Sequence, residues 1–366
     1  MKRRLLDLVI CPRCGDDLGC TRVDLEDSVS GEVCEGELGC GAGHLYPVID
    51  GVPRLLPPEL LAETLAHLHP EWHRRYRDHL AGEGTGEPGL KKKTLKSFGF
   101  QWNAFSEMYA QWEANFRSYF EPLVRPEEFR GRLVLDAGCG FGRHAYYAAG
   151  YGAEVVAMDL SEAVAAAHRN TRTLPGVHVV QGDIYRPPLK PIFDMVYCVG
   201  VIQHLPDPEQ GFRSLARLLA VDGALFVWVY GRRRGVYRLV DLMRRATTRM
   251  PMGPLYRMAW GLNLLSFAAF SLPYRLLRRV PGAGPLARAW PFTRYADLPL
   301  RVGHADWFDR LSAPSTVYFE RSEVEGWYRR AGLTAFEIQS REGIGWRALG
   351  RGGDRSAGSA AGTERD

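Results

Sequence analysis

The stretch Leu133-Val-Leu-Asp-Ala-Gly-Cys-Gly-Phe-Gly-Arg-His144 decides the fold. Three apolar, β-favouring residues lead into Asp136, glycines then alternate with other residues from Gly138 through Gly140 onward, and a helix-like run follows at 143–151. This pattern predicts a strand, a tight glycine turn and the N-terminus of a helix. Glycine lets a ligand approach the backbone, and the helix N-terminus offers free N–H groups to an anion. Doubly wound α/β proteins bind nucleotide-like ligands at such a turn.

Three more strands are predicted downstream, and each ends on polar residues. Val155–Met158 runs into Asp159, Val177–Gln181 into Gly182 and Asp183, and 193–198 into a loop at 199–207. An acid about 20 residues after the glycine turn is placed to hold ribose hydroxyls. Because parallel strands end at one edge of a sheet, we expect these side chains to lie close together.

In order and spacing, the segments LDAGCGFGRH, MDLS, QGDIY and FDMVYCVGVIQHLPDP resemble the motifs of class I S-adenosylmethionine (SAM) dependent methyltransferases. The resemblance covers roughly residues 97–230, with a weaker echo at 315–350. It implies an α/β fold with a Rossmann-like, mostly parallel sheet and an antiparallel last strand. We assign residues 97–350 to this domain, with Ser322 as N-cap of a closing helix.

The resemblance also implies roles for individual residues in binding SAM. Asp136, Gly138 and Gly140 would meet the amino acid end of the cofactor. Asp159 would accept hydrogen bonds from the ribose hydroxyls, since a carboxylate can accept two at once. Asp183 would take the adenine amino group, and the apolar walls would be Leu160 and Ile184.

The aromatic-rich segment 97–120 precedes the core, where class I methyltransferases commonly place a helix over the cofactor. Phe100, Gln101 and Trp102 would close the SAM pocket. The alternative is that these large side chains only cap the core, because aromatic rings dominate burial.

Methyl transfer from SAM is a one-step displacement, so alignment does much of the work. A base is required only where the acceptor must lose a proton. His204 follows the fourth strand and has a suitable ordinary pKa of about 6.5, and Gln203 would orient the acceptor. The alternative is that both residues merely shape the loop.

Residues 1–60 contain a Cys11-Pro-Arg-Cys14 knuckle, whose thiolates can take two corners of a zinc tetrahedron. The unit resembles the small zinc-ribbon proteins that activate tRNA and protein methyltransferases. It departs from them at the second knuckle, where Cys40-Gly-Ala-Gly-His44 lacks the second cysteine. We assign a structural zinc to Cys11, Cys14, Cys40 and His44. Two alternatives stay open: Cys34 as the fourth ligand, and a ribbon that folds without metal.

A helix and linker are predicted over residues 61–96, and an insert over 231–313 separates the fifth strand from the closing elements. The insert holds fifteen uncharged residues, 259–273, flanked by arginines. One interpretation is a helical lid packed on the domain. The other is contact of 254–279 with a membrane surface or a lipid-linked substrate, because the run is too short to span a bilayer.

The net charge of +5 is unevenly distributed. Residues 231–300 hold 13 Arg and two acids, Asp241 and Asp297, so this segment carries +11 and the rest of the chain −6. The segment lacks the interleaved aromatic and basic pattern of a nucleic-acid face, so no nucleic-acid partner is expected.

The seven cysteines do not form a disulfide framework, and no signal peptide is recognisable. We expect a cytoplasmic protein, peripheral at the inner membrane face under the membrane-contact interpretation, with a disordered tail at 351–366. Its predicted activity is O- or C-methylation of a small-molecule, glycan or lipid-linked acceptor. A non-catalytic SAM-binding or methyltransferase-activating partner is the alternative. A NAD-dependent oxidoreductase is a weaker one, because the glycine spacing is not GxGxxG. The oligomeric state is not predicted.

Overall fold

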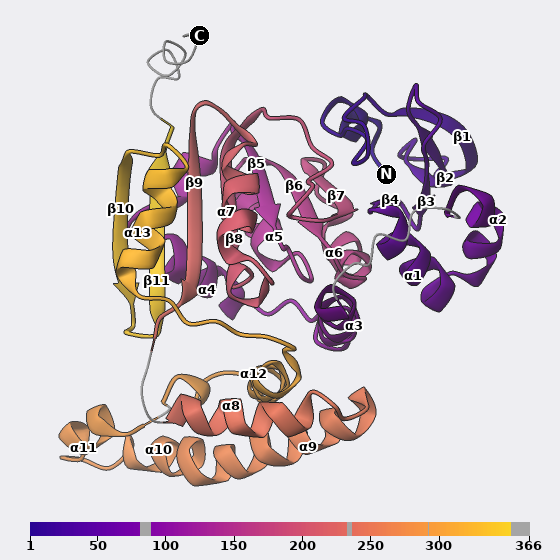
Figure 1. Cartoon of the computed structure of the whole chain (residues 1–366). Helices are drawn as coiled ribbons and strands as arrows, with labels where there is room; N and C mark the ends of the chain where they lie inside the picture. The colour runs from indigo at the N-terminus through magenta and orange to yellow at the C-terminus, as the bar shows by residue number, and fades with distance from the viewer. Residues whose placement is uncertain (81–88, 233–235, 292, 353–366) are drawn as a thin grey trace, which may run out of the picture.

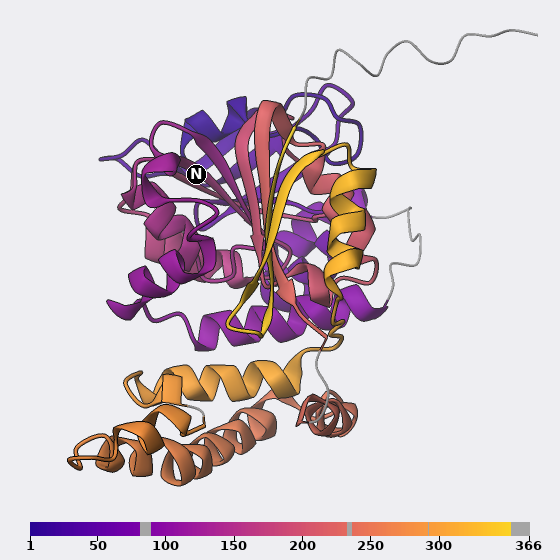
Figure 2. The same cartoon turned by 90° about the vertical axis from the view of Figure 1, so that its left-hand side faces the viewer.

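A computed structural model describes residues 1–80, 89–232, 236–291 and 293–352. A sheet of eleven strands runs through the described chain in the order β1-β2-β3-β4-β7-β6-β5-β8-β9-β11-β10. Helices cover both of its faces (Figures 1 and 2).

The central strands are almost entirely buried, which explains their continuous apolar sequences. They are parallel to one another, whereas β11 is antiparallel to both β9 and β10. The predicted Rossmann-like sheet with an antiparallel last strand is therefore confirmed. The bounds are β5 Leu133–Ala137, β6 Glu154–Asp159, β7 Val177–Gly182, β8 Phe193–Val199, β9 Leu219–Tyr230, β10 Ala335–Arg341 and β11 Gly345–Arg351.

The helices of this part are α3 Gly89–Ala104, α4 Gln111–Phe120, α5 Arg143–Gly150, α6 Ala163–Thr171, α7 Pro208–Ala216 and α13 Arg321–Arg330, with 3₁₀ turns η2 Pro126–Phe129 and η3 Ile202–His204. Asp207 caps α7 by accepting a hydrogen bond from the Gln210 amide. The prediction of Ser322 as N-cap is wrong: α13 begins one residue earlier, and Glu320 is its N-cap. Glu320 and Glu323 satisfy each other's backbone N–H groups in a capping box.

The N-terminal residues form an antiparallel β region that continues the main sheet. Its fourth strand pairs in parallel with β7, with Arg54 opposite Gln181 and Leu55 opposite Gly182. Leu55 belongs to the same buried cluster as Val156 of β6. The elements are η1 Arg3–Asp7, β1 Gly19–Glu26, β2 Val33–Gly39, β3 Leu45–Ile49, β4 Val52–Leu55, α1 Pro58–Leu68 and α2 Pro70–Leu80.

The predicted insert is a separate helical layer at one end of the sheet (Figure 1). Helix α12 lies nearest the sheet, and α9 packs on its far side (Figure 2). A small core around Phe308 and Leu255 joins them and also holds Phe105. The bounds are α8 Val236–Thr247, α9 Met252–Ser266, a π-helical turn η4 Phe267–Ser271, α10 Leu272–Leu277, α11 Gly284–Ala289, η5 Thr293–Tyr295 and α12 Leu300–Ser312.

Within the described ranges, no helix combines the length and the apolar character needed to cross a bilayer. Of the predicted linker and tail, residues 81–88 and 353–366 lie outside the described residues.

Candidate active site

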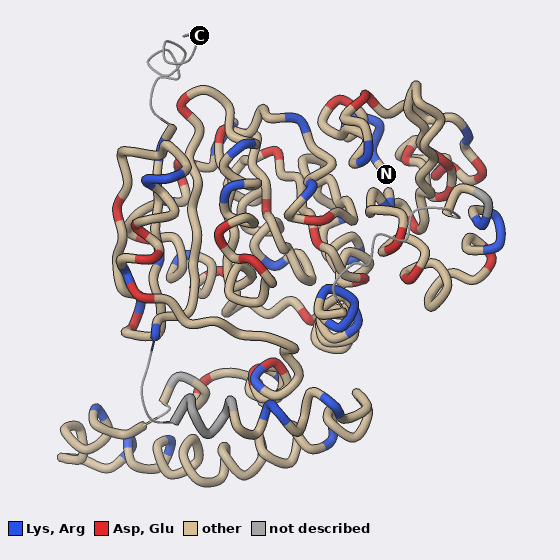
Figure 3. The backbone as a smooth tube through the Cα atoms, in the orientation of Figure 1, with Lys and Arg blue, Asp and Glu red and all other residues tan. Residues whose placement is uncertain are grey.

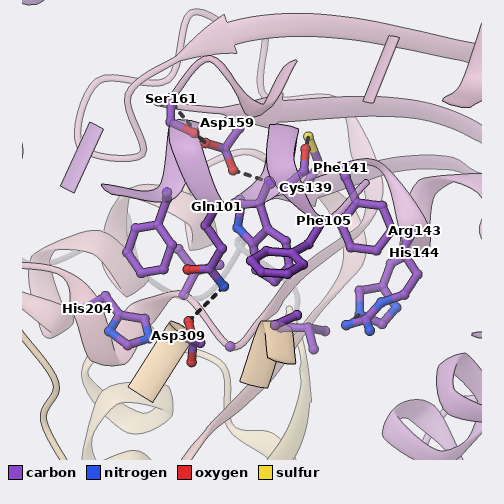
Figure 4. Close-up of a pocket in the computed structure, with 18 of the residues that line it drawn as sticks. Gln101, Phe105, Cys139, Phe141, Arg143, His144, Asp159, Ser161, His204 and Asp309 are labelled. Atoms are coloured by element: carbon purple, nitrogen blue, oxygen red, sulfur yellow. Dashed lines mark hydrogen bonds between the residues drawn. The ribbon is translucent and has the colours of Figure 1, made fainter. Parts of the chain in front are cut away.

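A cavity of about 260 Å³ opens where the carboxyl ends of the central strands meet the insert (Figure 4). The strand order reverses there, because β5 lies between β6 and β8. The cavity brings together most of the residues expected to bind SAM or to act in catalysis. These lining residues are Trp102, Gly138, Gly140, Asp159, Leu160, Asp183, Ile184 and His204. Asp136 and Gln203 are buried beside the cavity and do not line it.

The turn after β5 requires its glycines. Gly138 and Gly140 have φ angles of 81° and 53°. A Cβ on Gly138 would lie 2.4 Å from Cγ2 of Val201, and one on Gly140 would lie 3.3 Å from Nε1 of Trp102. Trp102 therefore lies directly over the turn, so helix α3 covers this part of the cavity as expected. Phe100 instead packs against Phe308 of the insert.

Asp159 is held in one orientation by groups of the adjoining turns. The Gly140 amide donates to its Oδ2 at 3.0 Å, while the Ser161 amide and hydroxyl donate to Oδ1 at 2.8 and 2.7 Å (Figure 4). Burial raises the pKa of this carboxyl, whereas the hydrogen bonds favour its ionised form. A carboxylate fixed at the cavity wall can accept further hydrogen bonds from a ligand.

Asp136 ends β5 with a side chain that is almost fully buried, at 1% exposure. Its Oδ2 has no hydrogen-bond partner among the described residues, and burial raises the pKa of this carboxyl to about 7. A buried, unsatisfied carboxyl oxygen is costly. Asp136 does not line the cavity, so its negative charge would stabilise the amino group of a ligand such as SAM from behind the glycine turn. Together with the fixed carboxylate of Asp159 at the cavity wall, the residues present fit that cofactor.

Asp183 follows β7, and both of its oxygens have partners. Nζ of Lys91, on α3, lies 2.9 Å from Oδ2, and the Tyr185 amide donates to Oδ1 at 3.0 Å. An adenine amino group at this position would share Oδ2 with Lys91 or displace it.

His204 lies in the turn after β8 with a defined tautomer. Its Nδ1 is 2.7 Å from the main-chain oxygen of Ser315, so Nδ1 carries the proton and Nε2 keeps its lone pair. Burial lowers the pKa of His204, which keeps the ring neutral near pH 7. The ring contacts Phe98 and Tyr230, with centroids 5.2 and 6.0 Å away. The arrangement suits a group that accepts a proton.

Gln203 is fully buried, at 0% exposure, and neither its amide oxygen nor its amide nitrogen has a hydrogen-bond partner within the described ranges. Its main-chain oxygen accepts from the Val317 amide, which ties the turn after β8 to the segment that follows the insert.

The insert and helix α5 supply polar lining residues that the sequence analysis did not select. Asp306 and Asp309 reach the cavity from α12, and Nε2 of Gln101 donates to Oδ1 of Asp309 at 3.1 Å (Figure 4). The guanidinium of Arg143 lies over the ring of Trp112, 4.7 Å from its centroid. No motif marks the two aspartates, whereas Arg143 directly follows the glycine turn and could have been found by that position. Residues on the inner side of the insert therefore form part of the cavity wall.

The N-terminal region gathers four metal-ligating side chains. Nδ1 of His44 lies 3.4 Å from both Cys11 Sγ and Cys40 Sγ, and Cys14 Sγ lies 3.7 Å from Cys40 Sγ. All four ligand atoms lie within 4.8 Å of one another, which is compatible with a tetrahedral zinc site. Cys34 is not in this group, because its Sγ contacts the main-chain oxygen of Glu32. Of the two candidate fourth ligands, His44 is the one that joins the cluster.

Residues 135–227 match the family described as a methyltransferase domain. An uncharacterized protein of Synechococcus sp. is 38% identical over 104 residues, which is 26% of this chain and 25% of that protein. A ubiquinone biosynthesis O-methyltransferase of Thiobacillus denitrificans is 33% identical over 151 residues, covering 37% of this chain and 64% of that enzyme. The chain thus spans between a quarter and about two thirds of the length of these curated relatives.

Among solved structures, the DhpI–SAH complex is 15% identical and covers 74% of this chain and 100% of that one, with a TM-score of 0.44. Magnesium protoporphyrin IX methyltransferase of Synechocystis with bound SAH is also 15% identical. It covers 81% of this chain and 100% of that one, with a TM-score of 0.38.

Proposed function

We propose that this protein is a SAM-dependent methyltransferase acting on a hydroxyl-bearing small molecule. The observation that carries the proposal is the single cavity in which Asp159, Asp183 and the glycine turn meet His204. Three consecutive strand ends contribute to it, and the methyltransferase-domain match spans those strands.

In this proposal the charge of Asp136, behind the glycine turn, stabilises the amino group of the cofactor, and Asp159 holds its ribose. Leu160 and Ile184 pack against the adenine, and Asp183 accepts from the adenine amino group in competition with Lys91. When bound, SAM supplies a methyl group already activated on a sulfonium. The chain's own contribution is then to align this cofactor with the acceptor, which can supply ~7–11 kcal/mol of the barrier lowering.

The acceptor occupies the half of the cavity formed by His204, Gln101, Asp309 and the surrounding aromatic rings. With SAM bound as the methyl donor, Nε2 of His204 would accept the proton that the acceptor hydroxyl loses on methylation. The Ser315 carbonyl accepts from Nδ1–H and stabilises the resulting cation. A C-methylated acceptor would use the same base, because an activated ring carbon also ends by losing a proton.

Hydroxyl acceptors are favoured because one of the relatives named above is a ubiquinone biosynthesis O-methyltransferase. Glycan and lipid-linked acceptors fit the same chemistry, since only the reacting hydroxyl has to reach His204. The Cys11, Cys14, Cys40 and His44 cluster would hold a structural zinc, because a closed four-ligand site leaves no position for a substrate.

A transfer assay tests the proposal. Purified protein is incubated with methyl-labelled SAM and a panel of catechols, phenols, sugars and lipid-linked phenols, and products are scored by mass. The proposal expects a product heavier by one methylene, and none with Asp159→Ala. SAM binding without transfer to any member would favour the non-catalytic partner.

A further inference from the structure

The outer side of the insert carries an apolar face directed away from the sheet. Helix α9, the π-helical turn and α10 follow one another without a break from Met252 to Leu277, a length of about 39 Å at ~1.5 Å per residue. Figures 1 and 2 show this rod as the outermost layer, with α12 between it and the sheet.

Large apolar side chains form a stripe along this rod. Leu265, Leu272 and Leu276 are 68%, 46% and 58% exposed, and Trp260 and Leu264 lie exposed on the same rod. Successive positions are four, one, seven and four residues apart. At about 100° per residue, all five fall within roughly 160° of the helix circumference, so they share one side of the rod. Contiguous exposed apolar patches, unlike singly scattered apolar side chains, mark interaction surfaces.

The charges at the ends of the stripe are mainly basic, although Arg278, just after α10, is paired with Asp297 at 2.7 Å. From Met258 to Leu277 the only charged residue is Arg275, and its Nε is occupied by the main-chain oxygen of Ala296. Exposed arginines stand at both ends, Arg257 before the stripe and Arg279 after it, and within the described part of the chain neither forms an ion pair. Figure 3 shows the rod as a largely uncharged run with basic residues around it.

We propose that this face binds the surface of an anionic lipid bilayer, with the rod lying parallel to the membrane. An exposed apolar helical face with basic ends is the pattern of an interfacial helix, and anionic headgroups attract the arginines. Charge complementarity favours lipid over a second copy of the chain, because a two-fold contact would bring like-charged segments of +11 together.

This inference does not depend on the reaction. The inner side of the same insert lines the cavity through α12. When the protein is bound to a membrane, only α12 and the rod would therefore separate the acceptor half of the cavity from the lipid.

Flotation of the full-length chain tests the proposal with two kinds of vesicle, phosphatidylcholine alone and phosphatidylcholine with 30% phosphatidylglycerol. We expect binding to the anionic vesicles at low salt that weakens at high salt. The double variant Leu265→Glu/Leu272→Glu should reduce binding at least tenfold, and Arg257→Gln/Arg279→Gln should reduce it on anionic vesicles. Val29→Glu is the matched control, since Val29 is 95% exposed in the β1–β2 turn and far from the rod in sequence.

Three results would overturn the proposal: no flotation of folded wild-type protein, equal binding to neutral and anionic vesicles, or wild-type binding by the leucine variant. Sedimentation velocity tests whether a second copy of the chain occupies this face instead. A dimer that the leucine variant dissociates would assign the face to a second copy and would also reject the membrane. Circular dichroism checks that each variant is folded.

Discussion

The carboxyl of Asp136 is the group that should make cofactor binding depend on pH. Burial raises its pKa to about 7, so below that pH it is largely protonated and carries no charge to attract an ammonium group. We predict that SAM affinity rises between about pH 5.5 and 8 as the carboxyl ionises. Calorimetric titration across this range measures the effect. The Asp136→Asn variant should bind SAM more weakly, with an affinity that does not change with pH. A wild-type affinity that does not change with pH would contradict the assignment.

The same shift has a consequence for the ligand-free chain. A carboxyl whose pKa is higher in the folded state binds its proton more tightly there than in the unfolded state. The contribution of Asp136 to stability is therefore present at low pH and is lost as the pH rises from the ordinary value of 3.8 through about 7.

His204 should affect the chemical step and leave cofactor binding unchanged. Its ring contacts Phe98 and Tyr230, and its Nε2 keeps the lone pair that a proton acceptor needs. For an acceptor found in the screen, His204→Gln should lower kcat by about 10²–10⁴ with the dissociation constant of SAM within about twofold of wild type. Unchanged kcat would assign His204 to the shape of the loop.

Among individual site residues, those that follow a recognisable strand pattern could be predicted from the sequence. Asp159 and Asp183 could be placed because each ends a strand that was recognisable from its apolar run, and parallel strands end at a common edge. Asp309 could not, because it reaches the cavity only through packing of the insert helix on the core. The partner of Asp183, Lys91, was missed because it reaches the cavity through the packing of α3 on the core.

Among the elements, β4 connects the N-terminal region to the cofactor site. Arg54 on this strand has 0% exposure and donates to both carboxylate oxygens of Glu162 at 2.9 Å. Glu162 lies three residues after Asp159, so the pair braces the turn that is expected to hold the ribose. This contact gives the N-terminal region a physical route to influence cofactor binding.

We predict that Arg54→Met lowers the melting temperature and weakens SAM binding about tenfold, because it leaves the Glu162 carboxylate without its main partner. Breaking a buried ion pair commonly costs about 3–5 kcal/mol. The double variant Arg54→Met/Glu162→Gln should recover part of both losses. Arg75→Met is the control, since Arg75 makes a similar pair with Asp24 on the surface. Equal effects of both arginine variants would contradict the bracing role.

The cysteine cluster predicts one zinc per chain. Mass spectrometry of purified protein should find it in wild type and in Cys34→Ser, and should find much less in Cys14→Ser. Strong chelation should lower the melting temperature, because a structural zinc contributes directly to folding. A metal-free wild-type protein with the same stability would favour the ribbon that folds without metal.

The parallel strands β5, β6, β7 and β8 were predictable from sequence, but the joining of β4 to β7 was not. Arg54 and Gln181 are far apart in the chain, and nothing in either segment announces a parallel pairing. The N-cap of α13 was missed because serine is a preferred N-cap residue, which pointed to Ser322. The helix instead uses a capping box formed by Glu320 and Glu323.

At the scale of the whole molecule, one insert has two sides with different chemistry. Its inner side closes the cavity through Asp306 and Asp309, and its outer side carries the leucine stripe. From the sequence, a helical lid and a membrane contact were two alternative interpretations of the insert. The two are compatible in space, since they use opposite sides of the same helical layer.

The measurement that tests the central claim most directly is a calorimetric titration of the full-length protein with SAM, with NADH in a parallel cell and Asp159→Ala as the control. We expect micromolar binding of SAM that the Asp159 variant loses, and no binding of NADH. Folded protein that binds NADH and not SAM would contradict the assignment of the cavity, and protein that binds neither would leave it without a cofactor role.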